Sequence, residues 1–186
     1  MQRSITEDVV IPEGSEIKPN LNDHTLTNKE GHTITNYGTL IIMDSVENGT
    51  FTRSDEKSTS SMAGGENSCS VLVNHGDMHI YDDAAVTIEG MVSPLILNGW
   101  KTSGESSADS SPDSSTDKKA ILNIEGGLFS GGKENIDNRY YGYVYIYGGT
   151  FQEGASDSIL NYNVLQIENG RFSTKSEKKR YGIKQF

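Results

Sequence analysis

The sequence is short of the residues that several protein classes depend on. Only 33% of its 186 residues are hydrophobic, and it contains one cysteine and four prolines. No window approaches the ~18 consecutive apolar residues of a membrane-spanning helix, so we expect no membrane contact. The single Cys69 excludes an intramolecular disulfide and a thiolate metal cage. A chain of this length and composition is expected to form one domain.

Positive charge is also scarce. Lys and Arg number 16 against 26 Asp and Glu, which gives a formal net charge of −10. Nucleic-acid binding needs clustered Lys and Arg to neutralise phosphates, so we expect no nucleic-acid partner. The first eight residues hold no apolar run before their acidic side chains, so no secretory signal is expected there.

Glycine, in contrast, is abundant and periodic. The pattern Ile-x-x-Gly-x-Phe begins at Ile124, Ile146 and Ile167, so its starts lie 22 and then 21 residues apart. The chain holds 20 glycines, and Asn, Asp and Ser accompany them between short apolar stretches. Regular spacing of this kind is the signature of a repeat architecture.

A second pattern precedes the first one. Ile-x-Asn-x-Gly-x-Leu-x-Ile begins at Ile34, recurs from Leu72 with Met in place of Leu, and recurs from Ile159 with Asn in place of Gly. Apolar residues that alternate with period two predict short strands with one buried face and one outward face. A 21–22-residue unit of such strands cannot bury its apolar face alone. Stacked copies can, which predicts a β-solenoid; the alternative is an antiparallel sandwich, for which equal spacing is not expected.

Asparagines recur at corresponding places in these units. They are Asn36, Asn74, Asn98 and Asn161. Asn tolerates the left-handed backbone of a tight corner, and its side-chain amide can bond to identical amides above and below. We therefore expect a column of stacked asparagines along one corner of the solenoid.

An asparagine ladder with rungs of about 22 residues resembles the right-handed parallel β-helix of the pectate-lyase-like superfamily. The two repeated patterns are similar to those of bacterial surface proteins and phage virion proteins of that fold. The resemblance covers roughly residues 8–172. It implies an all-β fold, a single-stranded right-handed parallel β-helix.

The same patterns divide the chain into parts. Residues 1–172 form the expected β-helix domain, with an irregular capping rung at 8–33. The steps from Ile42 to Ile80 and from Ile80 to Ile124 are 38 and 44 residues, so loop excursions are expected at 52–70 and 101–119. Six of the 16 basic residues lie in the last 16 positions. Residues 173–186 are therefore expected to form a basic C-terminal cap or docking tail.

Catalytic chemistry is not indicated. The resemblance implies uronate or galactose polymers as substrates, cleaved by a calcium-binding carboxylate cluster with an arginine base or by paired aspartates. Only Asp77 stands mid-strand on the expected outward face, and Asp82 and Asp83 fit a turn. His75 and His79 would lie about 13 Å apart along a strand, too far for one ion. We expect no catalytic residue, no metal and no cofactor.

Tyrosines mark the expected contact surface. In the stretch 139–147, Gly142, Val144 and Ile146 match inward positions, so the alternating tyrosines must point outward. Tyr37, His75, Tyr141 and Tyr162 are expected to form one column. The candidate interface residues are Tyr37, Tyr141, Tyr143, Tyr145, Tyr147, Tyr162, Lys178, Lys179 and Arg180.

Exposed aromatic surface on a protein without a catalytic set predicts a structural or binding role. The expected partners are a second copy of the chain, giving a homotrimer, a capsid or other virion protein, and a host surface glycan. The first hypothesis is a virion-associated phage protein on the particle surface, as a capsid decoration, head fibre or tail component that mediates assembly or attachment. The alternative is a glycan-binding adhesin on the bacterial cell surface. A third is a polysaccharide lyase or glycoside hydrolase.

Overall fold

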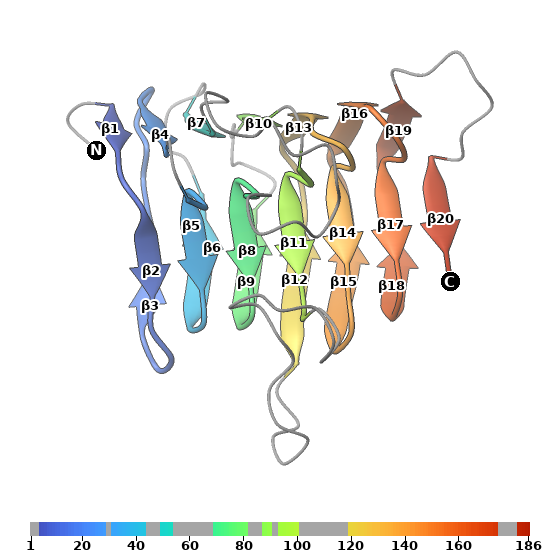
Figure 1. Ribbon diagram of the computed structural model, residues 1–186, viewed down its shortest axis with the longest axis horizontal. Coiled ribbons are helices and arrows are strands. Elements are labelled where there is room, and N and C mark those ends of the chain that lie inside the picture. The colour runs from blue at the N-terminus through green and yellow to red at the C-terminus, as the bar shows by residue number, and fades with distance from the viewer. Residues whose placement is uncertain are drawn as a thin grey trace.

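The chain winds through three parallel sheets. The computed structural model describes residues 4–28, 31–43, 49–53, 69–81, 87–90, 93–100, 119–174 and 182–186. These residues form strands and turns, and none of them is helical. Successive strands visit sheets A, B and C in turn, and each pairs in parallel with the strand one rung before and one rung after it (Figure 1). The predicted all-β solenoid is therefore confirmed.

The sheets contain seven, seven and six strands. Sheet A consists of β1 (Ile5–Thr6), β4 (Thr25–Thr27), β7 (Thr50–Thr52), β10 (Thr87–Gly90), β13 (Leu128–Gly131), β16 (Thr150–Gly154) and β19 (Arg171–Thr174). Sheet B consists of β2 (Val9–Ile11), β5 (Ile34–Asn36), β8 (Leu72–Asn74), β11 (Ile96–Asn98), β14 (Ile136–Asn138), β17 (Ile159–Asn161) and β20 (Ile183–Gln185). Sheet C consists of β3 (Glu16–Ile17), β6 (Thr39–Ile42), β9 (Asp77–Ile80), β12 (Ala120–Ile124), β15 (Gly142–Ile146) and β18 (Val164–Ile167).

The register reproduces the sequence repeat. Ile124 pairs with Ile146 and Ile146 with Ile167, which are the 22- and 21-residue steps. Ile80 lies beside both Ile42 and Ile124, so the two longer steps also advance the chain by one rung. The strands that follow each longer step are therefore in register with those that precede it. Residues 54–68 and 101–118, which make up most of both predicted excursions, lie outside the described part of the chain.

The core is a narrow stack of apolar columns. The isoleucines at positions 42, 80, 124 and 146 are fully buried. Phe129, Phe151 and Phe172 stack with ring centroids 4.6 and 4.8 Å apart and within 5° of parallel. Each fully buried side chain of this size contributes roughly 1.5–3 kcal/mol of hydrophobic stabilisation. A few apolar residues per rung are enough to build this core, which explains the low hydrophobic content.

The asparagine ladder runs along the corner between sheets B and C. Each side-chain amide donates to the side-chain oxygen of the next rung, at 2.8 Å from Asn36 to Asn74, Asn74 to Asn98 and Asn98 to Asn138, and at 2.6 Å from Asn138 to Asn161. All five side chains are completely buried. The predicted ladder is confirmed, with Asn138 as an additional member.

Additional bonds tie each ladder amide to the corner. Asn74 Nδ2 also donates to the carbonyl of Ile121, and Asn74 Oδ1 accepts from the backbone N–H of Gly76. Asn36 makes the same two bonds, to the carbonyl of Asp77 and from the N–H of Gly38. Because the buried side-chain amides of the ladder are hydrogen-bonded, the ladder stabilises the corner instead of destabilising the core.

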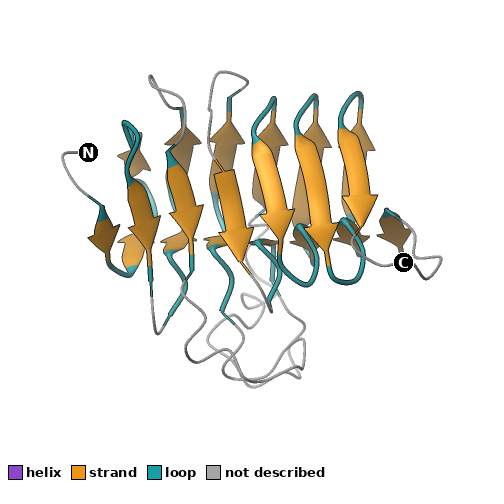
Figure 2. Ribbon diagram, turned by 90° about the horizontal axis from the view of Figure 1, so that it is seen from above, coloured by secondary structure: helices purple, strands orange, loops and turns teal. Residues whose placement is uncertain are grey.

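The two ends of the ladder differ from its middle. In the first rung the position beside Asn36 is held by Ile11, so an apolar side chain occupies the ladder position there. At the other end Asn161 donates to Oε1 of Gln185 at 2.7 Å. Gln185 belongs to β20, which pairs with β17 and continues sheet B beyond residue 172, where the sequence repeat stops (Figure 2). In the described residues no helix is long and apolar enough to cross a bilayer.

Removing one ladder amide tests the importance of this column. We expect Asn74→Ala to lower the free energy of unfolding by about 2–4 kcal/mol, because it leaves the buried amides of Asn36 and Asn98 each without one partner. Urea denaturation followed by far-UV circular dichroism measures the change. Asn123→Ala, on the outward side of β12, is the matched control and should change stability by less than about 0.5 kcal/mol. Equal losses in the two variants would contradict the stabilising role of the ladder.

One buried carboxyl makes stability depend on pH. Glu134, in the turn between β13 and β14, is 2% exposed, and burial raises the pKa of its carboxyl from 4.5 to about 7. Lys133 Nζ lies 3.4 Å from Glu134 Oε1 and opposes this rise, whereas Asp137 and Asp157 add to it. The folded protein therefore holds a proton on Glu134 at pH values where the unfolded chain releases it.

We expect the free energy of unfolding to fall as pH rises from 4.5 to about 7, because the unfolded state ionises first over that interval. The loss from this group is about 3 kcal/mol and is complete above pH 7. Glu134→Gln should flatten this part of the profile, as measured by urea denaturation at several pH values. Glu168→Gln, at an exposed position, is the control. An unchanged profile for Glu134→Gln would overturn the assignment.

Candidate functional site

An aromatic column follows the asparagine ladder on its solvent side. Its rings come from successive rungs at the same corner and contact one another, Tyr37 stacked on His75 and Trp100 tilted by 31° against His75. Centroids lie 5.0 Å apart for Tyr37 and His75, and 4.9 Å apart for His75 and Trp100. A second group follows, in which Tyr162 stacks with Tyr140 at 6.2 Å and with Phe186 at 4.7 Å. The backbone N–H of Trp100 donates to the backbone carbonyl of Tyr140 and links the two groups.

The expected membership of this column was wrong at one position. Tyr140, and not Tyr141, stacks with Tyr162. Four residues separate Asn138 from Tyr143, whereas two separate Asn74 from Asp77, which holds the same position in sheet C. Tyr141 sits in that longer turn with φ of 60°. Trp100 and Phe186 could not be found by pattern, because neither is followed by a copy of the repeat.

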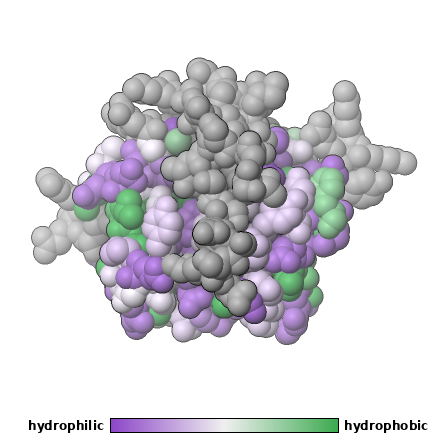
Figure 3. All heavy atoms as spheres, turned by 60° about the horizontal axis from the view of Figure 1, so that its bottom comes forward, coloured by the Kyte–Doolittle hydropathy of each residue, from purple (hydrophilic) through white to green (hydrophobic). Residues whose placement is uncertain are grey.

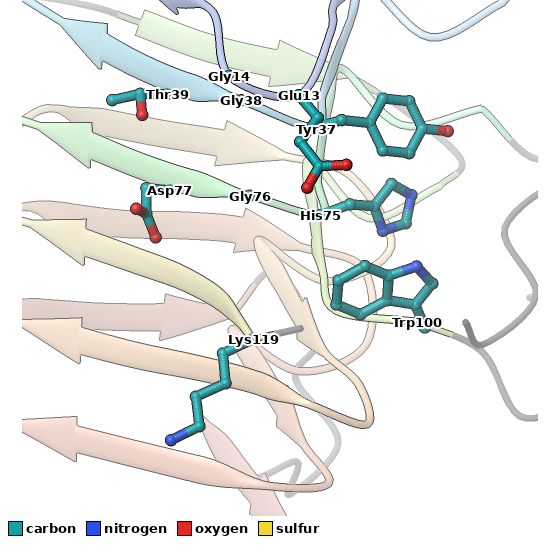
Figure 4. Close-up of a pocket in the computed structure, with 10 residues that line it drawn as sticks. All are labelled: Glu13, Gly14, Tyr37, Gly38, Thr39, His75, Gly76, Asp77, Trp100 and Lys119. Carbon is teal, nitrogen blue, oxygen red and sulfur yellow. The ribbon is translucent and has the colours of Figure 1, made fainter. Parts of the chain in front are cut away.

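A corner groove of about 420 Å³ lies beside the first three rings. Its floor is bare backbone: a Cβ atom on Gly38 or Gly76 would approach a carbonyl oxygen to 2.3 or 2.2 Å. Figure 4 shows the rings of Tyr37, His75 and Trp100 one above another, with Thr39 and Asp77 further along their strands. The lining residues are Glu13, Gly14, Tyr37, Gly38, Thr39, His75, Gly76, Asp77, Trp100 and Lys119. Because the rings stack on each other, they offer mainly their edges to a ligand.

The outer face of sheet C presents tyrosines differently. Tyr143 lies between Ile121 and Val164, and Tyr145 lies between Asn123 and Gln166. Neither ring therefore has another ring beside it in its own column, and Tyr143 instead has the Lys119 ammonium 5.0 Å from its centroid. Tyr147 follows on the same side and is 42% exposed. These three tyrosines offer ring surface that is not occupied by a stacked aromatic neighbour in the described structure.

Polar side chains surround the tyrosines of β15. His79 Nε2 lies 2.8 Å from Glu125 Oε1, and the His79 ring stacks on Tyr81 at 4.0 Å. Gln166 Nε2 donates to Glu168 Oε1 at 3.2 Å. The face therefore combines aromatic surface with carboxylates, amides and an imidazole, which lie on parallel strands of one sheet or directly after them.

The other predicted site residues fall in several places. Tyr37 and Tyr162 belong to the aromatic column, and Tyr143, Tyr145 and Tyr147 belong to the outer face of sheet C, so the tyrosines form two surfaces instead of one. Lys178, Lys179 and Arg180 lie outside the described residues, as do Asp82 and Asp83.

The bottom of Figure 1, where the turns between sheets B and C lie, faces the viewer in Figure 3. Its coloured surface is mainly hydrophilic, with small separate hydrophobic groups.

His75 and His79 lie on different surfaces of the solenoid and do not form a joint metal site. His75 stands in the aromatic column and is 4% exposed, whereas His79 lies on the outer face of sheet C. Within the described ranges, no group of three or more His, Cys, Asp or Glu is placed to hold a metal ion. Asp77 and Glu125 stand in different columns of sheet C, because Asp77 pairs with Ile121 and Glu125 follows the end of β12.

A second hollow, of about 320 Å³, lies at the corner between sheets C and A. Glycines from three successive turns form most of it, and Gly127, Gly149 and Gly170 have φ of 99°, 101° and 146°. Its other lining side chains are Thr150, Asn169 and Arg171.

Comparison with known proteins identifies no relative: no family model, no curated protein and no solved structure matches this chain.

Proposed function

We propose that this chain is a non-enzymatic attachment protein that binds a carbohydrate chain on the outer face of sheet C. The observation that carries the proposal is the row of tyrosines along β15, whose rings have no stacked aromatic neighbour and stand among hydrogen-bonding side chains. A tyrosine ring offers an apolar surface with a polar tip, which suits the apolar faces and hydroxyl groups of a sugar. The aromatic column fits this role less well, because the faces of its rings already contact neighbouring rings of the same column.

The solenoid holds these groups in a fixed array. Neighbouring strands of a sheet are about 4.8 Å apart and alternate side chains along a strand about 7 Å apart, so the backbone sets the spacing of the contacts. A preformed surface loses little conformational entropy when a ligand binds. A repeating polymer can use several such contacts at once.

A second copy of the chain is the competing occupant of this face, and the homotrimer expected from the tyrosines stays a prediction. Asp77, Glu125 and Glu168 accompany the tyrosines on this face. A contact between two copies of this face would bring like charges together within a chain of net charge −10. This charge favours a sugar over self-association.

The biological setting also stays a prediction. A phage particle, with a capsid or other virion protein as partner, is the first setting and a bacterial cell surface the alternative; attachment to a glycan suits both. The lyase or hydrolase hypothesis would need a paired acid and base. The separation of Asp77 and Glu125 into different columns supports a binding role instead.

Substitution of two tyrosines tests the proposal. We expect the wild-type protein to be retarded in native gels that contain at least one of dextran, mannan, β-glucan or galactan. Tyr143→Ala/Tyr145→Ala should weaken that binding about tenfold or more, because it removes two sugar-stacking surfaces. Tyr140→Ala, which removes a tyrosine of the aromatic column, is the control and should bind as the wild type does.

Two further measurements complete this test. Light scattering reports whether the double variant changes oligomeric mass. A lower mass together with no glycan binding by the wild type would assign the face to self-association. Release of reducing ends or unsaturated uronates from any polysaccharide would contradict a non-enzymatic function.

A further inference from the structure

We infer that the outer face of sheet C selects uncharged, hydroxyl-rich glycans and rejects polyuronates and other polyanionic chains. This inference rests on the proposed function and names its ligand class. The charges on the face carry it, together with the way in which each charged group is held.

Carboxylates from several rungs point outward from sheet C. Glu16 belongs to β3 and Asp77 to β9, while Glu125 and Glu168 directly follow β12 and β18. Glu13 adds a further carboxylate at the corner groove, which Asp77 also lines. An anionic polymer that lies across these strands would meet negative charge on several of them.

The positive groups do not offset this charge. Lys18 Nζ lies 2.9 Å from Glu16 Oε1, and its pKa is raised by the hydrogen bond and charge of Glu16, so these two groups neutralise one another. Lys119 remains, with its ammonium over the Tyr143 ring. Apart from the Glu16–Lys18 pair, this face therefore carries the ammonium of Lys119 and three carboxylates, those of Asp77, Glu125 and Glu168. None of the described residues on this face is an arginine.

The carboxylates are placed to accept hydrogen bonds. His79 holds Glu125, and the amide of Gln166 holds Glu168, so each of these carboxylates has a defined position and further lone pairs. A sugar hydroxyl can donate to such an oxygen, and bonds to ionised acceptors are stronger than neutral ones. A uronate carboxylate has no proton to donate and is repelled.

The repulsion reaches the tyrosines. Electrostatic screening acts over about 10 Å at 0.1 M salt, and neighbouring strands are about 4.8 Å apart. A polymer seated on Tyr145 and Tyr147 of the β15 rung lies one strand away from Glu125 on one side and from Glu168 on the other. The uronate polymers that the superfamily resemblance implies as substrates are therefore the class that this face excludes.

Affinity gels with defined polymers test the inference. Dextran, mannan, β-glucan and galactan are the neutral probes, and polygalacturonate and alginate are the polyuronate probes. We expect the wild-type protein to bind a neutral probe and to bind both polyuronates at least tenfold more weakly. Raising the salt concentration should leave the neutral interaction unchanged and should strengthen, not weaken, any residual polyuronate binding, because it screens a repulsion.

Charge-neutralised variants locate the effect. Asp77→Asn/Glu125→Gln/Glu168→Gln removes three charges from the face and should increase polygalacturonate binding about tenfold. Glu7→Gln/Asp8→Asn/Glu153→Gln removes the same number from exposed positions elsewhere and should leave it unchanged. Equal gains in both variants would assign the exclusion to net charge and overturn the role of the face.

The outcomes separate this inference from the proposed function. Wild-type protein that binds polygalacturonate as tightly as the neutral polymers, with loss of binding in the Tyr143→Ala/Tyr145→Ala variant, would overturn the inference and leave the glycan-binding role standing. Wild-type protein that binds no polymer of either class would overturn both.

Discussion

The stacked hydrogen bonds of the asparagine ladder are the interaction on which the rest of the structure depends. Five buried amides bond to one another only when the same position of each rung reaches the same corner. A slip of one residue in any rung would move the buried amide of that rung out into solvent and would turn its apolar side chains outward. The ladder therefore fixes the register of sheet B, and with it the aromatic column outside the corner and the direction of the tyrosines that follow in sheet C.

The same ladder makes the two ends of the solenoid unlike each other. Ile11 holds the ladder position in the first rung, and Gln185 holds it in the last. If two copies stacked end to end in register, the exposed Gln185 side chain would be buried against the apolar Ile11 and its amide would lose contact with water. An unpaired buried amide costs about 1–3 kcal/mol, which disfavours an open-ended fibre.

Two kinds of aromatic surface result from one repeating backbone. At the corner, rings of successive rungs stack on each other, so Tyr37, His75 and Trp100 stabilise the fold and expose edges. On sheet C, Tyr143 and Tyr145 have aliphatic or amide neighbours in their columns instead of aromatic rings, and the Lys119 ammonium lies over the Tyr143 ring. In the proposed function, the carboxylates that share this face select which ligand can approach, while packing provides the binding surface.

The spacing of Ile, Phe and Asn by itself determined the solenoid, its rung length and four of the five ladder amides, because these follow from local alternation and from a repeat that each rung satisfies alone. Asn138 was not predicted as a ladder member because two additional residues in its turn break the pattern. For the same reason Tyr140, and not Tyr141, belongs to the aromatic column. Only the tertiary structure decided that the tyrosines divide between two surfaces, that Gln185 completes the ladder and that Glu134 is buried. These features depend on which residues of neighbouring rungs lie side by side, and that pairing is set by the lengths of the turns across the whole stack.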